Sequence, residues 1–147
     1  MRSFKTDLEF GLKKEEEMIN KIKQQFPFEK DIKNTKDLYN NIYCSYDYEG
    51  MTHNSRFELK SRTCKKDAYK TTIIPVHKIN DISTGNGEKD LYCIFNFTDF
   101  VTYIKYDKKL FDKFEKKTYK IQREGRYDPA TLHYEIPTAL LLNFNSI

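Results

Sequence analysis

The first long segment with a regular pattern of apolar positions runs from about residue 7 to residue 26. Its apolar residues recur at helical spacing and predict an amphipathic helix: Leu8, Leu12, Ile19, Ile22 and Phe26. Pro27 ends this helix because it has no N–H to continue the hydrogen-bond ladder. At about 100° per residue, Glu15 lies in the middle of the apolar stripe. An unpaired buried carboxylate is costly, so we expect Glu15 to be paired, to bind a metal or to line a cleft.

Segments rich in aromatic and β-branched residues follow the helix and predict strands. Residues 42–49, a turn around residues 50–54 and residues 56–64 predict a β-hairpin. Residues 91–97 are apolar on both faces, which is typical of a central strand covered on both sides. Residues 100–106 follow after a short turn and predict its hairpin partner.

Shorter patterns fill the rest of the chain. We expect a weak strand within residues 28–35, strands over residues 118–124 and 132–136, and short helices from Pro75 to about residue 82, over 108–116 and over 138–144. This order of helices and strands predicts an α/β or α+β sandwich.

Chemically interesting side chains cluster on the predicted hairpin. Alternate side chains of a strand share a face, so Glu58 and Lys60 emerge together while Phe57 and Leu59 face a core. The hairpin would bring Asp47 toward both. Two carboxylates suit a hard divalent cation, and a lysine can steady an attacking water or a phosphate charge. The alternative is a cross-strand salt-bridge network on a solvated sheet face.

Basic residues concentrate near this hairpin and are expected to contact the phosphates of a nucleic acid, with an ordinary solubilising surface as the alternative: Arg56, Arg62, Lys65, Lys66, Lys70 and Lys78. Among the aromatic residues, Tyr69 is held open as a substrate contact. The formal net charge of +4 comes from 26 basic and 22 acidic residues, so it permits a polyanionic partner without requiring one.

Length and composition limit the remaining classes. A chain of 147 residues with 38% apolar content predicts one domain, residues 1–147. The three cysteines match neither a zinc site nor a small disulfide framework, and no apolar stretch approaches a membrane span. We therefore expect a soluble intracellular protein, cytoplasmic or nuclear, without a membrane partner.

The arrangement of these motifs resembles the PD-(D/E)XK, or restriction-endonuclease-like, nucleases. The matching pieces, in the family's order, are Gly11-Leu12-Lys13-Lys14-Glu15, then Asp47, then Glu58-Leu59-Lys60-Ser61-Arg62. Archaeal Holliday-junction resolvases of that superfamily are similar in motif order. Tyr46 stands where the family often has proline. The resemblance covers about residues 7–106, and the C-terminal extension, about residues 107–147, carries no family pattern.

The resemblance implies a central mixed β-sheet flanked by helices and an Mg²⁺-dependent endonuclease that hydrolyses DNA, with RNA not excluded. It implies that Asp47, Glu58 and the carbonyl of Leu59 bind Mg²⁺, for which Mn²⁺ could substitute. Lys60 would orient water or offset charge, and Glu15 would complete the catalytic set. Cleavage of both strands would favour a homodimer. The alternatives are a catalytically inactive nucleic-acid-binding or assembly module of the same fold, and a generic α+β interaction domain.

Overall fold

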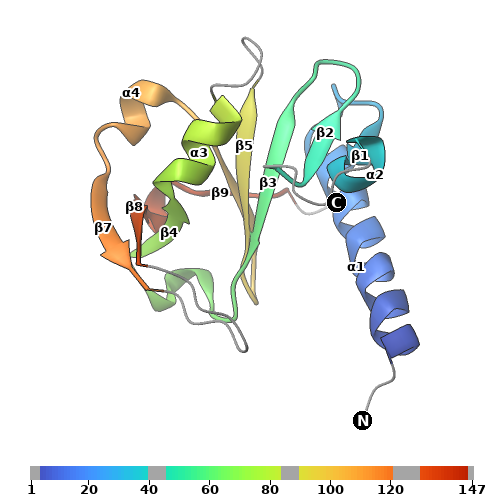
Figure 1. Cartoon of the computed structure of the whole chain (residues 1–147), viewed down its shortest axis with the longest axis horizontal. Helices are drawn as coiled ribbons and strands as arrows, with labels where there is room; N and C mark the ends of the chain where they lie inside the picture. Colours follow the sequence, from blue (N-terminus) through green and yellow to red (C-terminus); the bar gives the residue numbers. More distant parts are fainter. Residues whose placement is uncertain (1–3, 40–45, 84–89, 121–129, 146–147) are drawn as a thin grey trace.

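Two β-sheets organise the chain in the computed structural model, which describes residues 4–39, 46–83, 90–120 and 130–145 (Figure 1). The larger sheet is mixed and has the strand order β1 (Ile32–Asn34), β2 (Tyr48–Gly50), β3 (Arg56–Ser61), β5 (Leu91–Asn96), β6 (Val101–Lys105), β9 (Leu142–Asn143). The smaller sheet is antiparallel, with the order β4 (Thr71–Pro75), β8 (Thr131–Pro137), β7 (Glu115–Tyr119). The expected mixed α/β fold is therefore confirmed.

Helices lie on both sides of the larger sheet (Figure 1). The helices are α1 (Phe4–Gln25), α2 (Thr35–Tyr39), α3 (Val76–Ser83) and α4 (Lys108–Phe111), with 3₁₀ turns at Lys66–Ala68 and Thr138–Leu140. Within the described ranges, no helix has the length and apolar character needed to cross a membrane.

The predicted N-terminal helix is confirmed as α1, which covers one face of the larger sheet. Met18, Ile22 and Phe26 of this region are buried against Phe57 of β3 and Ile94 of β5. The helix stops just before Pro27, as expected from the missing N–H. Glu15 is half-buried on this helix, between the exposed Lys14 and Glu16.

The other face of the larger sheet packs against α3 and the smaller sheet. Cys93 and Phe95 of β5 share a buried cluster with Ile74 of β4 and with Ile79 and Ile82 of α3. The five residues from Leu91 to Phe95 are all buried, which confirms the prediction of a strand covered on both faces.

The β2–β3 hairpin is also confirmed, but the strands pair only briefly. Tyr48 pairs with Phe57 and Glu49 with Arg56. The predicted strand over residues 42–49 falls partly on residues 40–45, outside the described residues. Beyond the hairpin, β3 pairs in parallel with β5 along six residue pairs, from Arg56↔Leu91 to Ser61↔Asn96. The far end of β3 therefore runs past β2 while it stays bound to β5.

Several predicted elements differ from the structure near the C-terminus. The helix expected over residues 108–116 ends at Phe111, and β7 begins at Glu115, earlier than the expected strand over 118–124. The helix expected over 138–144 is wrong: a 3₁₀ turn leads into β9, which pairs with β6. Pairing with an open sheet edge overrides the local apolar spacing there. The extension thus contributes strands to both sheets.

Two elements were not expected at all. Strand β4 lies in a segment for which no strand was predicted, and it is held by antiparallel pairing with β8. Helix α2 lies in a segment for which no helix was predicted. The Asn34 side chain accepts a hydrogen bond from the Lys36 N–H at 2.8 Å, which is the local capping interaction that such residues provide.

A buried carboxylate holds the turn of the β2–β3 hairpin. Glu29 is only 1% exposed, and its carboxylate accepts hydrogen bonds from the backbone N–H groups of Thr52 and His53 and from the Ser55 hydroxyl, at 2.9–3.1 Å. Gly50 lies directly against it, and a Cβ added there would overlap the Glu29 carboxyl group. The hydrogen-bond donors of this turn point into the protein, and the Glu29 carboxylate accepts the hydrogen bonds that water would otherwise accept.

We predict that Glu29→Ala destabilises the protein by about 2–4 kcal/mol, because it leaves several inward-facing donors without an acceptor. Gly50→Ala should cost about 1–3 kcal/mol through overpacking. The double variant should lose less than the sum, since removing the carboxylate makes room for the added methyl group. Urea unfolding measures all three, with Glu16→Ala as the exposed control. Additive losses would contradict the proposed contact.

Candidate active site

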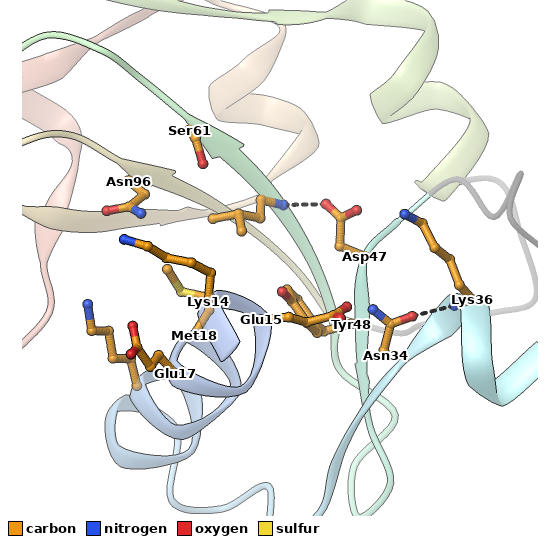
Figure 2. Close-up of a pocket in the computed structure, with 12 residues that line it drawn as sticks. Lys14, Glu15, Glu17, Met18, Asn34, Lys36, Asp47, Tyr48, Ser61 and Asn96 are labelled. Carbon is orange, nitrogen blue, oxygen red and sulfur yellow. Dashed lines mark hydrogen bonds between the residues drawn. The ribbon is translucent and has the colours of Figure 1, made fainter. Parts of the chain in front are cut away.

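Asp47 occupies the point where β2 and β3 separate. Its backbone N–H donates to the carbonyl of Phe57 at 3.0 Å, which continues the hairpin by one step. Its carboxylate Oδ2 then accepts the Leu59 N–H at 2.8 Å (Figure 2). The Asp47 carboxylate thus accepts the hydrogen bond that a backbone carbonyl would accept if β2 were longer. This arrangement holds Asp47 beside the middle of β3.

Glu58 meets Asp47 at this point. Its side chain is 2% exposed, on the face of the larger sheet that packs against α3. Burial raises the pKa of Glu58 to about 9, and the hydrogen bond to Asp47 and the negative charge of Asp47 act in the same direction. The ammonium groups of Lys78 and Lys60 oppose this rise in pKa. The buried Glu58 carboxyl group therefore holds its proton strongly.

Lys60 and Lys78 provide positive charge around Glu58. The Lys78 ammonium, on α3, lies 3.5 Å from Glu58 Oε2. Among the described residues, that oxygen has no hydrogen-bond partner. Lys60 is half-buried on the same face of β3, and burial lowers its pKa while the charge of Glu58 raises it. The expected neighbourhood of Asp47, Glu58 and Lys60 is present.

Glu15 approaches Asp47 from the opposite side of the sheet. Both line a cavity of about 420 Å³ between α1, α2 and β3, together with Lys14, Lys36, Ser61 and Asn96 (Figure 2). Burial raises the pKa of Glu15, as do the charges of Asp37 and Asp47, whereas Lys36 lowers it. Leu59 and Ser61 line this cavity, so Glu58 and Lys60, which alternate with them, face away from it. Asp47 therefore lies between Glu15, on the α1 side of the sheet, and the side chains of Glu58 and Lys60, on the α3 side.

The acidic residues form a pair rather than a cluster. Over the ranges that the structure describes, no three His, Cys, Asp or Glu side chains are grouped as a ready metal site. The Leu59 carbonyl supplies a third oxygen, because the N–H and C=O of one strand residue point to the same neighbour and its N–H points to Asp47. The oxygen atoms available to a cation at this place would be those of two carboxylates and one backbone carbonyl.

The predicted phosphate-binding residues separate into two groups. Arg56 is only 4% exposed and donates to the Ile82 carbonyl, so it ties β3 to α3 and offers almost no surface to a phosphate. Arg62 is half-buried and bonds Thr72 Oγ1 at 3.1 Å and the Ile73 carbonyl at 2.5 Å. Lys78 is paired with Glu58. These three side chains have protein partners.

The remaining three lie beyond the end of β3. Lys65 and Lys70 are exposed, and Lys66 donates to the Leu141 carbonyl and to Asn143 Oδ1 at 3.2 and 2.8 Å. Lys65 and Lys66 border a second cavity, described below. Their placement leaves charge available for an anionic partner, with Lys65 and Lys70 the most accessible.

The structure adds residues that sequence reasoning did not single out. Lys14, Lys21 and Lys36 line the Asp47 cavity, and the amides of Asn34 and Asn96 lie around it. The spacing of Lys14 and Lys21 on one helix was visible, since seven residues are nearly two turns. Lys36 had no comparable pattern because it reaches the cavity from α2.

No family model, curated protein or solved structure matches the chain.

We predict that Glu58→Gln stabilises the metal-free protein at high pH. The folded state raises the pKa of Glu58 from 4.5 to about 9, so the folded state binds more protons than the unfolded state between these values. The stability that this extra proton binding contributes is fully present below the unfolded pKa, and it is lost as pH rises toward the folded pKa.

The stability of the wild type relative to Glu58→Gln should therefore fall by up to about 1.4 kcal/mol per pH unit. Unfolding in EDTA between about pH 5 and pH 8 measures the difference. Glu115→Gln, on the exposed edge of β7, is the matched control. Parallel profiles of wild type and Glu58→Gln would contradict the prediction.

Proposed function

We propose that the chain is a metal-dependent nuclease that hydrolyses DNA phosphodiester bonds. The observation that carries the proposal is the contact of the Asp47 and Glu58 carboxylates where β2 leaves β3, with Lys60 on the same face as Glu58. The mixed sheet with helices on both faces, together with the resemblance of the motifs to PD-(D/E)XK nucleases, supports it.

The residues present fit a hard divalent cation. Asp47, Glu58 and the Leu59 carbonyl would hold Mg²⁺, with Mn²⁺ as a substitute. Mg²⁺ is commonly bound by one or two carboxylates, with water and substrate phosphate completing its shell. The buried Glu58 Oε2, which has no hydrogen bond among the described residues, supports this fit. When bound, the cation supplies an activated water and neutralises phosphate charge.

The protein side chains would do the remaining work. Lys60 lies on the same face of β3 as Glu58 before the substrate arrives, so its ammonium group would offset charge that develops on the phosphate without reorganisation. Glu15 lines the cavity that reaches Asp47 from the α1 side, so it would orient water there. Lys14 and Lys36, at the same cavity, would contact the phosphates that Arg56 is too buried to reach.

The partner in this proposal is a DNA strand, and RNA offers the same phosphodiester chemistry. The described ranges of one copy contain one such site. Cutting both strands of a duplex would therefore require two copies, and a homodimer is part of the proposal.

The second candidate is a catalytically inactive nucleic-acid-binding or assembly module of the same fold. The ion pair between Lys78 and Glu58 favours it, because this ammonium group already offsets part of the cost of burying the Glu58 carboxyl group. A buried ionic group of this kind can serve structure alone.

An assay on plasmid and branched DNA with Mg²⁺ or Mn²⁺ tests the proposal. Glu58→Gln and Lys60→Ala should each reduce cleavage at least about 100-fold, because the first removes a carboxylate ligand of the cation and the second removes a positive charge placed for the transition state. Glu115→Gln and Lys109→Ala, both exposed and distant in sequence, are the matched controls and should cleave like the wild type.

The outcome separates the two candidates. Equal nicking by wild type, Glu58→Gln and Lys60→Ala would mean that a contaminant cleaves the DNA, and the nuclease proposal would fall. Salt-sensitive binding without cleavage would favour the inactive module, since phosphate contacts weaken as salt rises.

A further inference from the structure

A second cavity, of about 380 Å³, lies beyond the end of β3. It is bordered by the segment after β3, the start of β4 and the end of β7, which come together on one side of the molecule (Figure 1). Its volume is in the range typical of small-molecule sites. The residues lining the Asp47 cavity are different ones.

The lining combines basic and aromatic side chains. Arg62, Lys65 and Lys66 are basic, and Tyr69, Phe97 and Tyr119 are aromatic. Of the described residues that line this cavity, none is acidic. Positive charge selects an anionic occupant, and aromatic rings provide stacking surfaces for planar groups. A nucleotide combines both properties in one ligand.

We propose that this cavity binds an unpaired nucleotide of the nucleic-acid strand, with its base stacked on Tyr69. The proposal rests on the proposed nuclease function and names its substrate class, a strand with an unpaired segment. Single-strand binding sites combine a basic track with aromatic stacking in this way.

Tyr69 is well suited to stacking because its ring is free while its backbone is held. The side chain is 69% exposed, the largest fraction among the large hydrophobic side chains described. Thr138 Oγ1 donates to the Tyr69 carbonyl at 3.1 Å, and the Thr138 N–H donates to the Lys70 carbonyl at 2.9 Å. The segment that carries the ring is therefore anchored before a ligand binds, which lowers the entropy cost of binding.

Arg62 connects this cavity to the Asp47–Glu58 pair. Its Nε and Nη2 atoms bond Thr72 and Ile73, and its guanidinium lies 5.5 Å from the centroid of the Phe95 ring. It follows Lys60 by two residues in extended chain, which is about 7 Å along the same face. A strand whose phosphate lies at Lys60 would therefore bring a neighbouring nucleotide to the cavity.

Binding of labelled oligonucleotides in EDTA tests the proposal without requiring cleavage. A short oligothymidylate is compared with an abasic oligonucleotide of the same length and charge, by fluorescence anisotropy. Tyr69→Ala should weaken thymidylate binding about 5–150-fold, the value of one stacked base, and leave abasic binding unchanged. Tyr69→Phe keeps the stacking ring and should bind like the wild type. Phe28→Ala removes an exposed aromatic ring that packs beside Phe26, in the cluster between α1 and the larger sheet, and is the control.

The results separate this inference from the nuclease proposal. Equal binding of thymidylate by wild type and Tyr69→Ala, or equal wild-type binding of thymidylate and abasic strands, would overturn the nucleotide cavity. Glu58-dependent cleavage would then still support the nuclease. Tyr69-dependent binding by a protein that does not cleave would support the cavity and remove the nuclease.

Discussion

The candidate site depends on one backbone amide that a side chain satisfies. Strand β2 pairs with β3 for two residue pairs, and the Asp47 carboxylate then accepts the Leu59 N–H that a longer β2 would have taken. Buried backbone donors need a partner, so this bond allows β3 to leave β2 and remain inside the fold. Its other edge stays paired with β5 throughout. The gap beside β3 is where Glu58 meets Asp47.

The buried turn at Glu29 supports this arrangement from the other end of the hairpin. Its carboxylate holds the residues that connect β2 to β3, so the register Tyr48↔Phe57 follows from the turn as well as from the core. A slip by one residue would move Glu58 to the α1 face and Leu59 away from it. By fixing this register, the turn keeps Glu58 on the face of the sheet where it meets Asp47.

Burying the Glu58 carboxylate costs free energy, and the neighbouring lysines offset only part of this cost. Lys60 and Lys78 lower its pKa, but burial and the neighbouring Asp47 raise it more. Sites arranged for chemistry often retain such destabilising groups. In the functional proposals, Glu58, Lys60 and Arg62 alternate along one extended segment. The reacting phosphate and the neighbouring nucleotide would then be bound by successive side chains on one face of the same chain.

Much of the fold was predictable because local periodicity reflects burial on one side of an element. The apolar stripe predicted α1, the alternation at Phe57, Glu58 and Leu59 predicted their opposite faces, and the fully apolar segment predicted β5. The pattern failed at β4 and β9, whose strand conformation depends on pairing with β8 and β6. Those partners are distant in sequence, so no local spacing reveals them.

The sequence by itself determined which side chains share a face and that Asp47 would come near Glu58. Only the tertiary structure decided what each face meets. It buried Arg56 against α3, placed Glu15 on the opposite side of the sheet from Glu58, and left Tyr69 exposed on an anchored segment. The physical reason is that periodicity records the direction of a side chain within its own element. Burial, pKa and access depend on which distant element packs in that direction.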